Sequence, residues 1–164
     1  MPFLDNFPVT TFQYDANNEI VVRDFIRSVQ INGPFFTQDA LFDTYYMSDG
    51  EKIENISYNY YGTSEYHWVI MYINGIFNPR KQCPQTEEYM RNICPDIYGN
   101  VDSIHHYEKT DGSGEWVDKF TKPSIPITNI QFMISQNELK RPIKLLKRQY
   151  LSYFLNQYEN AINS

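Results

Sequence analysis

Two cysteines and two adjacent histidines are the side chains of this sequence that could bind a metal ion. They are spaced Cys83-x10-Cys94-x10-His105-His106. A tetrahedral zinc site usually contains a short pair such as Cys-x2-Cys or His-x3-His, and this sequence has neither. Because neighbouring residues of a strand point to opposite faces, we do not expect His105 and His106 to bind one ion together. The sequence therefore predicts hydrogen-bonding histidines, reduced thiols, no metal site and no other cofactor.

Two glutamates are spaced for acid–base chemistry. Glu51 and Glu54 would lie on one face of a helix, where they could share a proton. Acidic pairs on a helix face are usually solvated, however, and strongly perturbed carboxylates are rare outside functional sites. The sequence contains no glycine-rich phosphate loop, no nucleophile elbow and no zincin helix pattern. We therefore predict that the protein is not an enzyme.

Five cations lie within nine residues near the C-terminus: Lys140, Arg141, Lys144, Lys147 and Arg148. A run of like charges is most often a solvated surface. In an acidic chain it can also form a docking patch that speeds association with an acidic partner surface. We adopt the docking patch as a hypothesis, with Lys144, Lys147 and Arg148 as its contacts.

The composition limits the classes of partner. Of the 164 residues, 16% are aromatic, which is too many rings for one small core, so some should face a partner. The net charge of −6 argues against binding to nucleic-acid phosphates. The longest apolar run, residues 68–73, is far shorter than the roughly 20 residues of a membrane span, and the N-terminus lacks a secretory signal. These features predict a soluble protein made in the cytosol.

Three consecutive regions differ in pattern, and we treat them as the domains of the chain. Residues 1–40 are an N-terminal extension, in which apolar residues at helical spacing predict a short helix over 22–29. Residues 41–80 are the most regular region. Its expected elements are a strand at 42–47, a helix at 51–61 ended by Gly62, a helix at 65–73 ended by Asn74-Gly75, and a return strand at 76–77.

Residues 81–164 form a looser C-terminal region. Its expected elements are a short helix that opens at Thr86 and stops before Pro95, a β-hairpin over 103–119, an extended arm over 120–137 with a strand at 130–134, a short strand at 143–145, and a helix over 148–162.

The central region resembles a LysM-type module, in which two helices lie between two strands in a βααβ core. The resemblance lies in the order of an isoleucine-bearing helix, a Tyr-Gly pair, a second helix and an Asn-x-Ile segment. The matching residues are Ile53, Ile56, Tyr61, Gly62, Trp68, Asn74 and Ile76. The resemblance implies that the isoleucines pack on the sheet and that Asn74 and Ile76 lead into the return strand.

Nearly the whole chain resembles the baseplate wedge subunit of contractile-tail, T-even-type bacteriophages. In that family a Val-x-Asp-hydrophobic-x-Arg segment, here residues 22–27, precedes the LysM-like module. An Ile-His-His-Tyr-Glu segment follows it, here residues 104–108. A Lys-Arg-x-Ile-x-x-Leu segment, here residues 140–146, leads into a terminal helix.

This resemblance implies an α+β fold: a small LysM-like βααβ core with extended N- and C-terminal segments and a C-terminal amphipathic helix. It implies a structural virion protein of the tail baseplate, which joins adjacent wedges and contacts the tail tube and sheath-initiation region. The partners would be other wedge and sheath-initiator proteins and neighbouring wedge copies, with no nucleic acid and no membrane. The protein would be made in the host cytoplasm and reside in the virion.

Two alternatives stay open: a peptidoglycan- or chitin-oligomer-binding LysM module of a tail-associated protein, and a small tail-associated hydrolase. Wall-binding modules usually accompany an export signal or a catalytic domain, and no acid–base pair supports a hydrolase. We expect the module to have lost carbohydrate binding, because it carries the bulky side chains Tyr60, Tyr61, Tyr66 and Trp68 and because flanking segments could cover it.

The C-terminal helix is expected to be an interaction element and not part of the core. Its apolar stripe consists of Leu151, Phe154, Leu155, Tyr158 and Ile162. A groove of another subunit would bury this stripe, with Leu151, Phe154 and Tyr158 as partner contacts.

Overall fold

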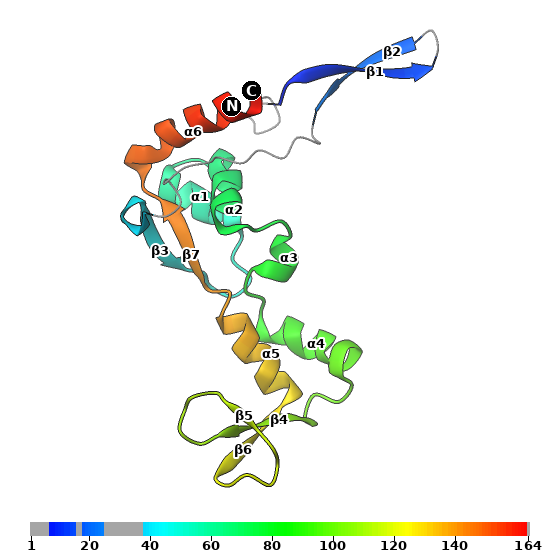
Figure 1. Cartoon of the computed structure of the whole chain (residues 1–164), viewed down its shortest axis with the longest axis vertical. Coiled ribbons are helices and arrows are strands. Elements are labelled where there is room, and N and C mark those ends of the chain that lie inside the picture. Colours follow the sequence, from blue (N-terminus) through cyan, green and yellow to red (C-terminus); the bar gives the residue numbers. More distant parts are fainter. Residues whose placement is uncertain (1–6, 16–17, 25–37, 164) are drawn as a thin grey trace. The chain divides into compact units, whose positions relative to one another are not determined.

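The computed structural model describes residues 7–15, 18–24 and 38–163, which belong to two compact units. Unit 1 comprises Met1–Thr44, Lys52–Phe77 and Lys144–Ser164, and unit 2 comprises Tyr45–Glu51 and Asn78–Ile143. Each unit is built from segments that are distant in sequence, so the units do not follow the three consecutive regions described above. Helices and strands occur in both, which confirms the α+β class (Figure 1).

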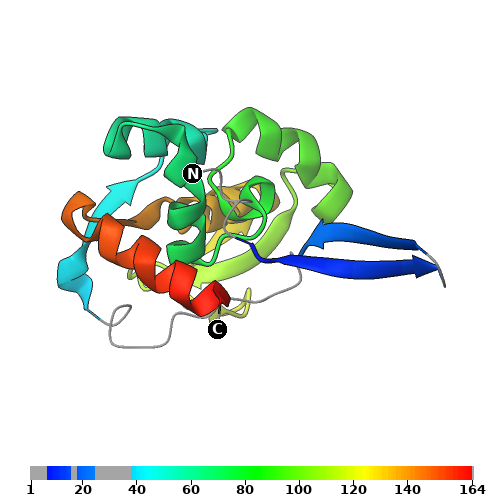
Figure 2. The same ribbon diagram turned by 90° about the horizontal axis from the view of Figure 1, so that it is seen from above.

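Unit 1 contains a β-hairpin of strands β1 (Val9–Asp15) and β2 (Asn18–Arg23), drawn as two blue arrows in Figure 2. The expected helix over 22–29 is wrong at its start, because Val22 belongs to β2. Residues 25–29 lie outside the described part of the chain. β-branched and aromatic residues on both sides of the hairpin turn favour strands over a helical turn.

One strand and four helical elements follow. They are η3 (Asp39–Leu41), β3 (Phe42–Tyr46), α1 (Ile53–Tyr61), η4 (Ser64–Tyr66) and α2 (His67–Asn74). Gly62 and Gly75 end the two α-helices with φ angles of 85° and 62°, so both helices end where the sequence predicts and both glycines are left-handed. The N-cap of η4 is Thr63, whose side-chain oxygen accepts a hydrogen bond from the Glu65 amide at 3.3 Å.

The strand that pairs with β3 comes from the C-terminal part of the chain: it is β7 (Pro142–Leu146). The Lys147 amide donates to the Leu41 carbonyl at 3.0 Å, and the Met47 amide donates to the Arg141 carbonyl at 2.9 Å. Because these bonds join the start of one strand to the end of the other, the pair is antiparallel.

The return strand expected at Ile76 and Phe77 is therefore wrong. The Ile76 amide donates to the Met71 carbonyl at 2.8 Å, which closes α2, and the chain then enters helix α3 (Pro79–Gln82). The short strand expected at 143–145 is confirmed as part of β7.

Helix α6 (Arg148–Asn163) completes the core of unit 1. The buried residues of this core are Phe7, Phe42, Trp68, Val69, Leu146, Phe154, Tyr158 and Ile162. The Trp68 ring of α2 lies 4.7 Å from the Tyr158 ring and 6.1 Å from the Phe154 ring of α6. The two helices thus lie side by side, as Figures 1 and 2 show.

Unit 2 combines helices with a small antiparallel sheet. Its elements are α3, α4 (Glu87–Tyr98), β4 (Ile104–Lys109), β5 (Trp116–Val117), β6 (Ser124–Thr128) and α5 (Asn129–Glu138), and the strand order is β5-β4-β6. The hairpin of β4 and β5 confirms the expected turn. The buried residues Met90 and Cys94 of α4 pack against Ile130 of α5.

Two expectations for unit 2 are wrong. The extended arm with a strand at 130–134 is instead β6 followed by α5. Thr128 and Gln131 form a capping box, in which each side chain accepts a hydrogen bond from the other residue's backbone amide, and this box starts the helix. Helix α4 begins after Thr86 as predicted but continues past Pro95 to Tyr98.

Candidate functional site

The cations predicted as partner contacts are engaged within unit 1. Lys144 Nζ donates to Asp39 Oδ1 at 2.8 Å, and this hydrogen bond and charge lower the pKa of Asp39. Lys147 Nζ donates to the Ala40 carbonyl at 2.7 Å. These contacts fix η3 beside β7, so neither lysine is a simple solvated charge.

Two tyrosines of α1 contact the same end of β7 and α6. Tyr60 OH donates to Asp43 Oδ2 at 2.5 Å, and burial together with this carboxylate raises the pKa of Tyr60 to about 12. Arg148 lies over the Tyr60 ring, 5.6 Å from its centroid. Tyr61 OH donates to the Leu146 carbonyl at 2.9 Å, and burial raises the pKa of Tyr61.

The apolar stripe of α6 faces the core of its own chain. Phe154 and Tyr158 are 1% and 3% exposed, and Leu151 is partly buried against the same cluster. The prediction that this helix lies outside the core is therefore wrong. The apolar faces of β3, α1 and α2 need another element to bury them, and α6 provides it.

The residues of the LysM-type motif lie in the interior of unit 1 or at its turns. Ile53, Ile56, Trp68 and Ile76 are buried. Asn74 Nδ2 donates to the Lys144 carbonyl, and Asn74 Oδ1 accepts from the Lys144 amide, both at 2.8 Å. The Asn74 amide thus pairs with β7 as the backbone of a neighbouring strand would.

The rings of His105 and His106 meet, although alternation along a strand would separate them. Their Nδ1 atoms are 2.9 Å apart, and His106 Nε2 lies 2.8 Å from Glu108 Oε1. The register between β4 and β6 is irregular between Ile104 and His106, which breaks the alternation of faces. The expectation of opposite faces is therefore wrong.

Aromatic rings enclose this histidine pair. The Phe132 ring stacks on His105 at 4.0 Å, and the Trp116 ring stacks on His106 at 4.1 Å. Burial and the neighbouring His106 lower the pKa of His105, which favours its neutral form. Within residues 7–15, 18–24 and 38–163, no group of three His, Cys, Asp or Glu side chains is placed to hold a metal ion.

The β1–β2 hairpin carries large apolar side chains that water can reach. They are Val9, Phe12, Tyr14, Ile20 and Val21, whose exposed fractions run from 47% to 74%. The register pairs Phe12 with Ile20 on one face and Thr11 with Val21 on the other. A two-stranded hairpin is only marginally stable in water by itself, and exposed apolar patches mark interaction sites. This surface was not predicted from the sequence, although strand-forming residues on both sides of Asp15 and Asn18 indicate it.

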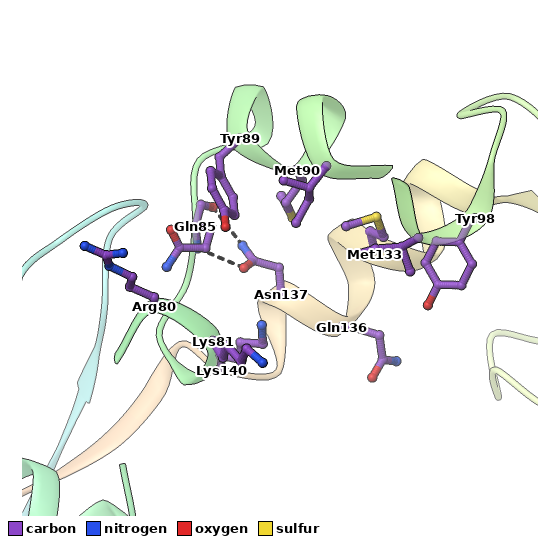
Figure 3. A pocket seen from close by; sticks show the side chains of 12 residues that line it. Arg80, Lys81, Gln85, Tyr89, Met90, Tyr98, Met133, Gln136, Asn137 and Lys140 are labelled. Atoms are coloured by element: carbon purple, nitrogen blue, oxygen red, sulfur yellow. Dashed lines mark hydrogen bonds between the residues drawn. The ribbon is translucent and has the colours of Figure 1, made fainter. Parts of the chain in front are cut away.

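Helices α3, α4 and α5 line a cavity of about 360 Å³ in unit 2 (Figure 3). Its lining residues are Arg80, Lys81, Gln85, Tyr89, Met90, Ile93, Ile97, Tyr98, Met133, Gln136, Asn137 and Lys140. Asn137 is buried and holds one wall: its Oδ1 accepts from the Gln85 amide at 2.9 Å, and its Nδ2 donates to the Gln85 carbonyl at 3.0 Å. No sequence motif indicates this cavity, because its lining residues come from separate elements.

Comparison with known proteins adds no family to these observations. In the part of the chain that the structure describes, no helix is both long and apolar enough to cross a membrane. No protein-family model matches the sequence, and no curated protein matches it.

Proposed function

We propose that the protein is a structural subunit of the baseplate of a contractile bacteriophage tail. In this proposal it is a wedge subunit that joins adjacent wedges, contacts the tail tube and sheath-initiation region, and catalyses no reaction. Its partners are other wedge and sheath-initiator proteins and neighbouring wedge copies. The ordered sequence resemblance supports this function, as does the high aromatic content.

The observation that carries the proposal is the exposed β1–β2 hairpin. Every residue of β1 is exposed, including Phe12 and Tyr14. An exposed strand edge can pair with a strand of a partner protein, and exposed apolar side chains can be buried under a partner's surface. A subunit that links neighbours in an assembly needs such a surface, whereas an enzyme of this size needs a reactive cleft.

The finer fold assignment is part of the same proposal. We assign β3, α1, α2 and β7 to a LysM-like module in which β7 takes the place of the usual return strand. The hydrogen bonds between Asn74 and Lys144 support this assignment, because they join the end of α2 to β7. Helix α6 then packs against the module as its C-terminal amphipathic helix.

The test uses tails made by the phage that encodes the chain. The variant Phe12→Asp with Ile20→Asp places two charges on one hairpin face, and Thr11→Asp with Gln13→Asp places two on the other. We expect the first variant to be incorporated into baseplates about tenfold less than the wild type. A few apolar anchor side chains carry most of the binding energy of an interface, and this variant replaces two of them with charges. Quantitative mass spectrometry of purified tails measures this incorporation, and circular dichroism checks folding.

Two results would overturn the proposal. One is the absence of the wild-type chain from purified tail particles. The other is saturable calorimetric binding of chitin oligomers in the micromolar range, which would assign the protein to the glycan-binding class. If both hairpin variants entered baseplates normally, the hairpin would not be the linking surface.

A further inference from the structure

The cavity of unit 2 has two chemically different ends. The apolar end is lined by Met90, Ile93, Ile97 and Tyr98 of α4 and by Met133 of α5. The other end has Arg80 and Lys81 of α3 and Lys140, which follows α5. In the view of Figure 3, Lys81 and Lys140 lie close together, Arg80 lies farther out on the same side of Asn137, and Met133 and Tyr98 lie on the other side. A ligand that fills this cavity must therefore be apolar at one end and polar at the other.

The charge at the polar end is uncompensated. Within the residues described, Arg80, Lys81 and Lys140 form no ion pair, and the cavity lining includes no carboxylate. Three other cations of unit 2 are paired, Arg91 with Glu87, Lys109 with Glu115, and Arg141 with Asp49 and Glu138, whereas Lys119 and Lys122 form no ion pair with the described residues. In a chain with a net charge of −6, three unpaired cations around one cavity indicate an anionic ligand.

We propose that this cavity is a docking site for an acidic segment of a partner protein, in which a large apolar side chain flanked by carboxylates inserts between α4 and α5. The apolar anchor packs on Met90, Ile97 and Met133, and the carboxylates of the segment face Arg80, Lys81 and Lys140. This inference rests on unit 2 alone and does not require the function proposed above.

The size and the spread of charge favour a polypeptide over a small anion. A cavity of about 360 Å³ is near the lower end of the range for small-molecule sites, roughly 300–1,000 Å³, so it suits one or two large side chains. The cations come from two elements, α3 and the end of α5, which suits carboxylates distributed along a chain better than one head group. Anchors in pockets with a charged rim are typical of peptide recognition.

The probe is a library of random twelve-residue peptides displayed on yeast and sorted against the full-length chain. The site variant is Lys81→Glu with Lys140→Glu. The matched control is Lys119→Glu with Lys122→Glu, which makes the same charge change in unit 2 outside the cavity. A third variant, Ile97→Asp, changes the apolar end at a side chain that is 56% exposed, so folding should tolerate it.

Peptides enriched on the wild-type chain should combine a large apolar residue with neighbouring Asp or Glu. Fluorescence anisotropy should show their affinity weakened about tenfold or more by the site variant and by Ile97→Asp, and changed less than about twofold by the control. Affinity should also fall with added salt. Enriched peptides without acidic residues, or equal binding to the site and control variants, would overturn the proposal. Binding of decanoate in the cavity, with no peptide bound there, would also overturn the proposal, in favour of a small amphipathic anion.

Discussion

The two units are stabilised in different ways. Unit 1 has a core of large rings, in which Trp68 and Tyr72 of α2 contact Phe154 and Tyr158 of α6. Unit 2 has a smaller apolar cluster around Met90. Two asparagine side chains of unit 2, Asn129 and Asn137, are also buried.

Both units use an asparagine amide as a substitute for a strand. Asn74 pairs with the Lys144 backbone in unit 1, and Asn137 pairs with the Gln85 backbone in unit 2. Asn137 is 2% exposed, whereas Asn74 is only half-buried. Burial of apolar area contributes most to folding stability. A buried hydrogen bond contributes most when its loss would leave a donor or acceptor with neither a protein partner nor water. Unit 1 therefore depends for its stability on the volume of its buried rings, and unit 2 on the hydrogen bonds of its buried amides.

The largest expected effect is in the core of unit 1. Phe154→Ala should lower the free energy of unfolding of unit 1 by about 3–5 kcal/mol, because it removes a fully buried ring and leaves a cavity. Urea unfolding reports this through Trp68 fluorescence in a Trp116→Phe background. The control, Tyr153→Ala on the exposed side of α6, should cost less than about 1 kcal/mol. Equal costs for the two changes would show that α6 is not part of the core.

An intermediate effect is expected for the amide of unit 2. Asn137→Ala should lower the free energy of unfolding of unit 2 by about 1–3 kcal/mol, because the backbone amide and carbonyl of the half-buried Gln85 lose the buried Asn137 side chain as their partner. Trp116 fluorescence in a Trp68→Phe background measures it. Asn74→Ala, measured in unit 1, should cost less than Asn137→Ala, because Lys144 is exposed and water can hydrogen-bond to its backbone in place of the lost amide. A larger loss of unfolding free energy for Asn74→Ala than for Asn137→Ala would contradict this difference between the two units.

The smallest effect is a pH dependence confined to unit 2. The pKa of His105 lies below its ordinary value of 6.5 in the folded state, so the unfolded state binds this proton more readily. Stability should therefore fall as the pH is lowered through about 6.5, and His105 should contribute no slope above that value. Urea unfolding followed by Trp116 between about pH 5 and 7.5 stays above the range of most carboxylates. His105→Gln should flatten this slope, and an unchanged slope would contradict the assignment.

Local signals predicted elements of both units correctly. The left-handed glycines Gly62 and Gly75 end helices because only glycine adopts that conformation without strain, and this property belongs to the residue itself. The hairpin around residues 110–114 and the strand β7 also follow from turn residues and alternation. Residues 130–134 were misleading, because isoleucine and phenylalanine suit a strand as well as a buried helix. The capping box of Thr128 and Gln131 was the local signal that could have corrected this expectation.

The candidate sites were less predictable than the helices and strands. The basic residues Lys144 and Lys147 could be recognised as a cluster, but their partners Asp39 and Ala40 are more than a hundred positions away in the sequence. The cavity of unit 2 has no motif, since its lining comes from α3, α4, α5 and the chain after it. The contact between His105 and His106 depends on an irregularity of sheet register that no periodicity reveals.

Turns, helix caps and amphipathic faces follow from the amino-acid sequence alone, because they depend on the conformational preferences of residues that are close together in the chain. Which of these faces pack against each other is set by tertiary contacts. Strand β3 pairs with β7 and not with residues 76–77, and the stripe of α6 covers α2 and not another subunit. The physical reason is that burial of apolar surface is not directional: any apolar face of suitable shape can cover another, and the choice depends on the whole chain.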